Sequence, residues 1–183
     1  MHAIVSLLDQ VYCMEIEDLW AELDRKFGVR SIYLTACPHF SYQVAEGYEV
    51  EALEAALQSV ALNMAPFQIR TGGLGIFTGS NPVLFVPVVR TPELSELHQR
   101  LWDELSETAR GLLGNYSPEK WIPHITLAHA DIDKNNLPKV IHLLGERDFD
   151  WEVQVDNLSF LYHTGADQEM RSRFEFGRPA PNS

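Results

Sequence analysis

The sequence has few basic residues for its length. Its 183 residues include 14 Lys and Arg against 26 Asp and Glu, which gives a formal net charge of −12. The acidic residues are spread along the chain, and neither half forms a basic arm. Tight, sequence-independent binding of long RNA or DNA depends on a positive surface. The charge therefore argues against long nucleic acid as a partner, while a small anionic ligand in one local pocket remains compatible.

Cysteines and long apolar runs are also scarce. Cys13 and Cys37 form neither a metal-ligand spacing nor a disulfide framework, which predicts reduced thiols. The first residues show no signal-peptide pattern, and no apolar run approaches the length of a membrane span. These absences predict a cytoplasmic protein without a membrane partner. They do not indicate an oligomeric state.

The chain does contain alternating helical and strand patterns. Hydrophobic residues make up 45% and charged residues 22%, which is ordinary for a globular protein. Apolar residues spaced by three and four predict helices at 11–27, 49–63, 92–112 and 137–144. Strand patterns occur at 2–8, 31–36, 67–70, 76–77, 83–89, 151–162 and 173–176. The glycines of 72–75 predict a structural turn or bulge rather than a phosphate loop, because neither Gly-Lys-Ser/Thr nor a helix follows them.

One short pattern, Pro-His-apolar-hydroxyl, occurs twice. The two copies are Pro38-His39-Phe40-Ser41 and Pro123-His124-Ile125-Thr126. Proline is tolerated at the first residue of a strand, and in a strand residues i and i+2 share a face. Each copy therefore predicts a strand that presents an imidazole and a hydroxyl on one side, His39 with Ser41 and His124 with Thr126. The apolar residues between them would face the core.

The two copies belong to a longer repeat, in which a His-x-Ser/Thr strand is followed by a helix and then by a pair of strands. Their offset of about 85 residues is too long for a solenoid and suits two related lobes. We therefore expect residues 1–183 to form a single domain of two lobes, one with the strand around 39–41 and one with the strand around 124–126. Pseudo-twofold packing would bring both motifs to one cleft.

Two imidazoles on opposite sides of a substrate can act as a base and an acid, because their unperturbed pKa of about 6.5 allows one to be neutral and the other protonated. Cleavage of a phosphodiester needs both functions. His39 and His124 are the candidate catalytic residues, and Ser41 and Thr126 would donate hydrogen bonds to the phosphate oxygens. This scheme needs no metal and no cofactor, and the chain lacks His-Glu-x-x-His or a similar metal-ligand spacing.

Residues 116–128, with the second motif and its lead-in, resemble the two-histidine (2H) phosphoesterase superfamily, which includes 2′-5′ RNA ligase-like proteins and cyclic nucleotide phosphodiesterases. The turn at 72–77 and the run at 83–86 are similar to a segment of the ligase-like branch. The resemblance covers about residues 30–176. The first motif departs from the family pattern in that Tyr42 stands where leucine is more usual.

The resemblance implies an α+β fold: a bilobed, pseudo-twofold duplication of antiparallel sheets with flanking helices and a central cleft. It also implies metal-independent hydrolysis of a 2′,3′-cyclic phosphate, or a similar cyclic or 2′-5′ phosphodiester, on a nucleotide or a short RNA end. By position, His39 would match the histidine that protonates the leaving oxygen and His124 the one that activates water, an order that the sequence does not fix. The alternatives are ligation, or a non-catalytic module that binds phosphorylated nucleotides or RNA ends.

Several further residues are candidates for the cleft. Tyr42, Phe77 and Trp121 are of a type that stacks on a nucleobase, although aromatic residues beside apolar runs are more often core. His163 is a candidate for the cleft rim. Arg171 and Arg173 are the densest basic pair, which either reaches a phosphate or lies on a solvated face.

The remaining histidines are interpreted as structural. His129 has the opposite strand parity to His124, which predicts that it lies on the other face of the strand. His2, His98 and His142 stand outside any pattern and are expected on the surface or in packing.

Overall fold

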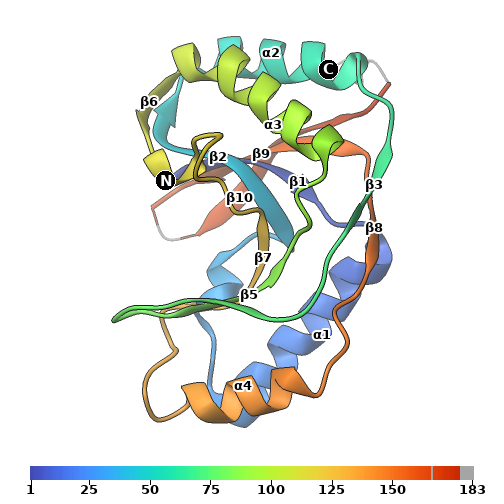
Figure 1. The fold of residues 1–183 in the computed structure, drawn as a ribbon. Coiled ribbons are helices and arrows are strands. Elements are labelled where there is room, and N and C mark those ends of the chain that lie inside the picture. The colour runs from blue at the N-terminus through green and yellow to red at the C-terminus, as the bar shows by residue number, and fades with distance from the viewer. Residues whose placement is uncertain (166, 178–183) are drawn as a thin grey trace.

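In a computed structural model of the protein, residues 1–165 and 167–177 are described, and they form four α-helices and ten β-strands (Figure 1). The helices are α1 (Gln10–Phe27), α2 (Val50–Leu62), α3 (Pro92–Leu105) and α4 (Leu137–Gly145). The strands are β1 (His2–Leu7), β2 (His39–Tyr48), β3 (Phe67–Arg70), β4 (Gly75–Phe77), β5 (Val83–Pro87), β6 (Ala109–Leu112), β7 (His124–Ala128), β8 (Glu152–Val155), β9 (Asn157–His163) and β10 (Gln168–Glu175).

The main sheet is built by duplication. Its strands follow the order β10-β9-β1-β2-β7-β5-β4, β6 pairs with β2, and the pairings are antiparallel. The inner six strands, β9-β1-β2-β7-β5-β4, match in pairs about the junction of β2 and β7: β2 with β7, β1 with β5, and β9 with β4. Strands β3 and β8, the next matching pair, form a two-stranded sheet with each other. This order confirms the duplicated α+β architecture.

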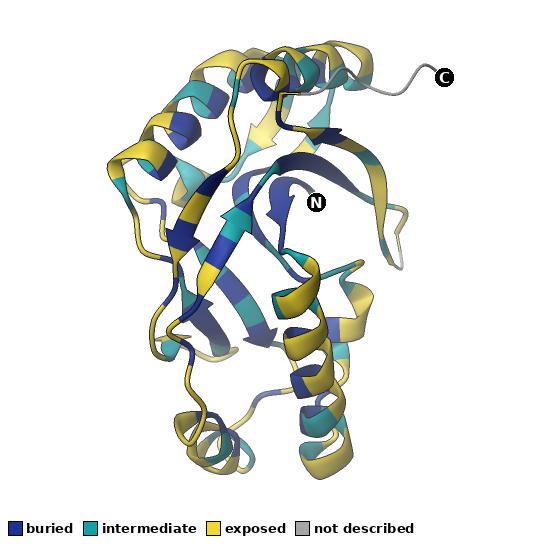
Figure 2. Ribbon diagram, turned by 90° about the vertical axis from the view of Figure 1, so that its right-hand side faces the viewer, coloured by how far each residue is buried: buried dark blue, intermediate teal, exposed yellow. Residues whose placement is uncertain are grey.

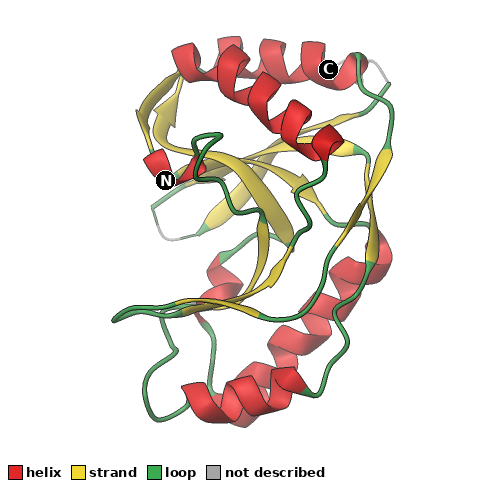
Figure 3. Ribbon diagram, viewed as in Figure 1, coloured by secondary structure: helices red, strands yellow, loops and turns green. Residues whose placement is uncertain are grey.

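Two pairs of helices flank opposite ends of the molecule (Figures 1 and 3). Helix α3 packs on β2 and α2 packs on β9 and β10, whereas α1 packs on β7. Figure 2 shows buried residues on the inward faces of the helices and exposed residues on their outward faces. Helix α3 thus covers the apolar side of the motif strand β2, and α1 covers that of the motif strand β7. The other side of each strand is left free for the cleft.

Local signals explain where the two longest helices begin and end. The side chain of Asp9 accepts hydrogen bonds from the backbone N–H groups of Val11 and Tyr12, and Gly28, whose φ is 70°, caps the C-terminal end of α1. The Thr91 side chain accepts from the N–H of Leu94 at the start of α3. Both helix starts lie within one residue of the predicted starts at residues 11 and 92.

The predicted strand at 31–36 is wrong. A short 3-10 helix occupies Ser31–Leu34 instead. Its first turn is held from the other half of the molecule, because the Asp131 carboxylate accepts hydrogen bonds from the N–H groups of Arg30 and Ser31, both 2.6 Å. This contact spans about a hundred residues of sequence, so local propensity did not reveal it.

Two other boundaries also differ from the prediction. Helix α3 ends at Leu105, not near residue 112, and residues Ala109–Leu112 form β6, which pairs with β2. Gly111 has a φ of +65°, a backbone conformation that interrupts a helix. The predicted strand at 151–162 is two strands in different sheets, because β8 pairs with β3 whereas β9 pairs with β1 and β10.

Candidate active site

The two motif strands lie side by side. Strands β2 and β7 are antiparallel neighbours whose register pairs Phe40 with Ile125, and both of these side chains are buried in the core. The antiparallel register through this pair sets His39 opposite Thr126 and Ser41 opposite His124. The structure therefore brings the two imidazoles and the two hydroxyls together, on the face opposite the core.

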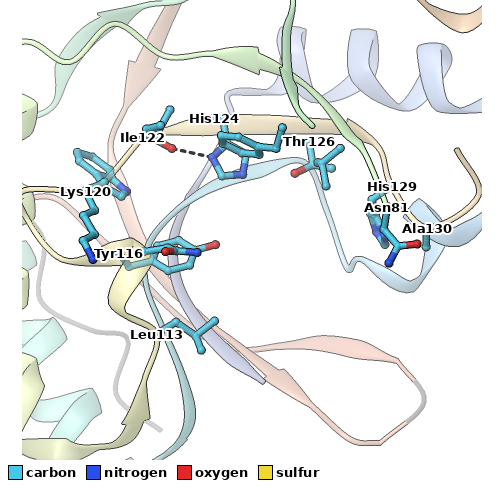
Figure 4. Close-up of a pocket in the computed structure, with 13 residues that line it drawn as sticks. Asn81, Leu113, Tyr116, Lys120, Ile122, His124, Thr126, His129 and Ala130 are labelled. Carbon is cyan, nitrogen blue, oxygen red and sulfur yellow. Dashed lines mark hydrogen bonds between the residues drawn. The ribbon is translucent and has the colours of Figure 1, made fainter. Parts of the chain in front are cut away.

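All four of these side chains line one small hollow of about 200 Å³. A larger hollow of about 720 Å³ adjoins it and shares Tyr116, His124, Thr126 and His129 with it (Figure 4). The larger hollow falls within the usual volume of a small-molecule site, roughly 300–1,000 Å³. Together they form one cleft of two unequal parts, joined along β7.

Both imidazoles are held by the same local hydrogen bond. The Nδ1 atom of His39 lies 2.8 Å from the carbonyl oxygen of Cys37, and that of His124 lies 2.7 Å from the carbonyl oxygen of Ile122. A carbonyl has no proton to give, so each Nδ1 must be the donor. The Nε2 atom of each ring is left as the nitrogen that can accept a proton from a ligand or, when protonated, donate one.

Burial keeps both rings neutral at neutral pH. The pKa of His39 is lowered to about 4, mainly by burial; the hydrogen bond to the Cys37 carbonyl acts against this shift, and the neighbouring His124 adds to it. Burial also lowers the pKa of His124, against the opposing effect of its hydrogen bond to Ile122. Because a positive charge on either ring disfavours one on the other, at most one of the two rings is an imidazolium in the free protein, which suits one base and one acid.

Two tryptophan indole groups donate hydrogen bonds to the backbone of the motif strands. The Nε1–H of Trp121 donates to the carbonyl of Ser41 at 2.8 Å, and the Nε1–H of Trp20 in α1 donates to the carbonyl of Thr126 at 3.4 Å. The ring of His98 stacks on Trp121 with centroids 3.8 Å apart and an interplanar angle of 5°. These contacts hold the backbone of Ser41 and Thr126 in position.

Three of the other aromatic and histidine candidates reach the cleft. Phe77 lines the larger part and meets the His124 ring edge-on, with centroids 5.0 Å apart. Trp121 also lines this part but is only 2% exposed, which leaves little of its ring for a ligand. His163 lines the smaller part. Tyr42, by contrast, is fully buried, and its hydroxyl lies 2.9 Å from the hydroxyl of Ser6.

The two arginine candidates do not line either part of the cleft. Arg171 lies 3.4 Å from the carboxylate of Glu54, and Arg173 lies 3.6 Å from that of Asp156. A β-bulge between Met170 and Ser172 interrupts the strand alternation at Arg171, so the regular parity behind the predicted shared face is absent, and both arginines pair with carboxylates outside the cleft. The structure thus gives the exposed-face interpretation more support than phosphate binding.

His129 does not lie where strand parity predicted. It lines both parts of the cleft, on the same side as His124 and Thr126 (Figure 4). The prediction extended the alternation of β7 too far, because the strand ends at Ala128 and Ala130 has a φ of 56°. The turn swings the His129 ring back into the cleft. A left-handed alanine has no sequence signal, so this residue could not be found from the pattern.

Sequence reasoning also missed Asn81, Tyr116 and Lys120, which line the larger part of the cleft (Figure 4). They come from loops and a short 3-10 helix, where periodicity carries no information. Within residues 1–165 and 167–177, no group of three or more His, Cys, Asp or Glu side chains is placed to hold a metal ion. Among the same residues, no helix is long and apolar enough to cross a membrane.

A duplicated antiparallel sheet that sets two His-x-Ser/Thr strands side by side in a cleft defines a two-histidine phosphoesterase. Residues 10–167 match the family model described as the 2′-5′ RNA ligase superfamily, and the chain belongs to this family of phosphoesterase-type enzymes. The resemblance seen in the sequence is confirmed by this match.

Known relatives and structures agree with this assignment. Proteins named "Putative phosphoesterase" from Bacillus cereus (strain B4264) and Bacillus mycoides (strain KBAB4) are 27% and 26% identical over 133 residues, which is 71% of this chain and 73% of each relative. The crystal structure of TT0787 of Thermus thermophilus matches with a TM-score of 0.66 and 19% identity, over 96% of this chain and 97% of that one. Escherichia coli LigT complexed with ATP matches with a TM-score of 0.54 and 15% identity, over 97% and 98%. At these identities, the two structures show the shared fold.

Proposed function

We propose that the protein hydrolyses a 2′,3′-cyclic phosphate, or a similar cyclic or 2′-5′ phosphodiester, on a nucleotide or a short RNA end. The observation that carries the proposal is the antiparallel juxtaposition of His39 and His124, each with Nδ1 hydrogen-bonded to a backbone carbonyl and Nε2 available. The structures of LigT with ATP and with 3′-AMP add support, because that relative binds small nucleotides in the same fold.

In the proposed reaction, the Nε2 of one imidazole accepts a proton from water, and the water oxygen forms a bond to phosphorus. The bond from phosphorus to the 2′ or 3′ oxygen breaks, and the second imidazolium gives its Nε2 proton to that oxygen. The hydroxyls of Ser41 and Thr126 donate hydrogen bonds to the non-bridging oxygens, where negative charge must be held. The product is a phosphate monoester and a free hydroxyl.

The two imidazoles divide the acid and base roles. The family resemblance matches His39 to the acid, whereas the stronger burial of His39, which lowers its pKa to about 4, favours it as the neutral base in the free protein. A substrate with a p-nitrophenyl leaving group separates these assignments, because p-nitrophenolate leaves without protonation. Alanine at the acid position should retain most activity on this substrate, whereas alanine at the base position should not.

The main test is hydrolysis of 2′,3′-cyclic nucleotides in the presence of EDTA. His39→Ala and His124→Ala should each lower kcat/KM by about 10²–10⁴-fold, the usual contribution of a general acid or base. His142→Ala is the matched control, because His142 is exposed on α4, and it should leave the rate unchanged. Equal rates in wild type and both cleft variants would refute the roles. Calorimetric binding of the cyclic nucleotide without product would instead indicate a binding module.

A further inference from the structure

The cleft carries little fixed charge. Four imidazoles line its smaller part, those of His39, His124, His129 and His163, and no Asp, Glu, Lys or Arg side chain of the described residues does so. In the larger part, Lys120 is the one such side chain among the described lining residues, and it is exposed. Met1, which is 51% exposed, also borders the smaller part. An anion at the motifs would therefore be held mainly by imidazoles and hydroxyls.

Hydrogen bonds hold the backbone at and next to His129. Its backbone carbonyl accepts a hydrogen bond from the Ser31 hydroxyl, and the neighbouring Asp131 carboxylate accepts from the N–H groups of Arg30 and Ser31. The 3-10 helix thus fixes the turn that follows β7. His129 lines both parts of the cleft. A phosphate bound between the motif strands would lie in the smaller part and the rest of the ligand in the larger part. The His129 residue lies where these two parts meet.

We propose that the cleft selects a phosphodiester with a single negative charge, that His129 is a third imidazole in contact with the phosphate, and that the doubly charged monoester product is bound weakly. The proposal rests on the proposed function for the location of the phosphate. It adds a weak affinity for the monoester product and a contact residue, His129, to the substrate class already proposed.

The physical reason is charge balance in a partly buried site. A phosphodiester monoanion facing one imidazolium is neutral as a pair. A phosphate monoester has a second pKa of about 6 and is close to a dianion above neutral pH. In the smaller part of the cleft, its second charge would meet no Lys or Arg side chain of the described residues, and an uncompensated charge in a desolvated site is costly. Hydrolysis of the diester therefore converts a favoured ligand into a disfavoured one, which promotes product release.

Calorimetry with two matched probes tests this inference: 2′-deoxyadenosine 3′-phosphate and its 3′-methyl ester. They share base and sugar, lack the 2′-hydroxyl needed for cyclisation, and at about pH 8 differ by nearly one charge. The methyl ester should bind at least about tenfold more tightly to the wild-type protein, which corresponds to about 1.4 kcal/mol. Equal binding, or tighter binding of the monoester, would overturn the proposal.

Variants at position 129 make the test specific. His129→Lys places a fixed cation at the phosphate and should remove or reverse the preference for the methyl ester, whereas His129→Gln, which adds no charge, should keep it. His142→Lys adds the same charge on exposed α4 and should change nothing. If His142→Lys acts like His129→Lys, the effect comes from net charge and the contact is refuted.

Turnover of 2′,3′-cyclic AMP is measured separately, so that the two proposals fail in different ways. Absence of turnover together with the methyl-ester preference refutes the hydrolase and supports the charge selectivity. Normal turnover without that preference refutes the selectivity and leaves the hydrolase in place.

Discussion

His98 lies outside the cleft but holds one of its walls. Its side chain is 1% exposed, and its Nε2–H is shared between the carbonyls of Tyr42 and Tyr116, at 3.0 and 3.1 Å. Its other nitrogen, Nδ1, is buried without a hydrogen-bond partner among the described residues. Protonation would place an N–H there with no acceptor, close to the Arg90 guanidinium. Burial and this charge lower the pKa of His98 to about 4.

The lowered pKa predicts that the protein loses stability as the pH falls. The unfolded histidine, with a pKa of about 6.5, binds a proton that the folded His98 and His39 reject until about pH 4. Their contribution to the free energy of unfolding is therefore complete above pH 6.5 and decreases between 6.5 and 4. Urea denaturation of wild type at a series of pH values should show this loss.

The matched variants for this experiment are His98→Gln and His142→Gln. Glutamine at position 98 keeps a side-chain N–H donor but does not titrate, so the pH dependence between 6.5 and 4 should become shallower. Glutamine at the exposed position 142 should leave the slope as in wild type. An unaltered slope in His98→Gln would contradict the assignment, whatever its stability at neutral pH.

The β4–β5 hairpin is the element that sets the aromatic wall beside His124. Gly75 pairs with Phe85, and a Cβ atom at position 75 would lie 2.2 Å from the Phe85 ring. That ring packs on Phe77, with centroids 4.2 Å apart, and on His124, with centroids 5.1 Å apart. The glycine therefore allows Phe85 to lie flat over β4 and to support the imidazole, a role that explains the turn sequence better than phosphate binding does.

Gly75→Ala should displace Phe85 and, through it, His124. We expect a loss of about 1–3 kcal/mol in the free energy of unfolding, as for other overpacked sites, and a fall in kcat on a 2′,3′-cyclic nucleotide. Gly72→Ala is the control, because a Cβ atom there meets nothing within 4 Å and its φ is not positive. Chemical denaturation and kinetics of both variants give the comparison, and equal behaviour of the two would exclude the proposed contact.

The sequence correctly predicted the elements that depend on a local residue pattern. It failed for the elements whose structure depends on contacts with segments distant in the sequence. The strand alternation at His39 and His124 persists in β2 and β7, so the pairing of imidazole and hydroxyl on one face was correctly foreseen. The 3-10 helix Ser31–Leu34 depends on Asp131, and β6 depends on an edge of β2. The local sequence of these two elements does not indicate their long-range partners.

For the whole molecule, the duplication explains why one cleft serves both motifs. Because β2 and β7 are equivalent strands that meet at the centre of the sheet, each half contributes one histidine and one hydroxyl at the same level. The sequence shows the repeat as two motifs that are about 85 residues apart. It does not show the register of Phe40 with Ile125, because packing across the junction of β2 and β7 fixes that register. The same junction lies within a molecule of net charge −12.

This net charge leads to a prediction about substrate size. A long RNA with a 2′,3′-cyclic end brings many phosphates toward an acidic surface, whereas a cyclic mononucleotide brings one. At low salt, about 0.02 M, repulsion reaches beyond about 20 Å, whereas near 0.3 M it is screened within several ångströms. The kcat/KM for the RNA should therefore rise several-fold over this range, while that for 2′,3′-cyclic AMP changes by less than about twofold. Steady-state rates for both substrates across the salt series measure this. A fall in the RNA rate with salt is the behaviour of a basic nucleic-acid-binding surface, and it would show that a local cationic path outweighs the net charge.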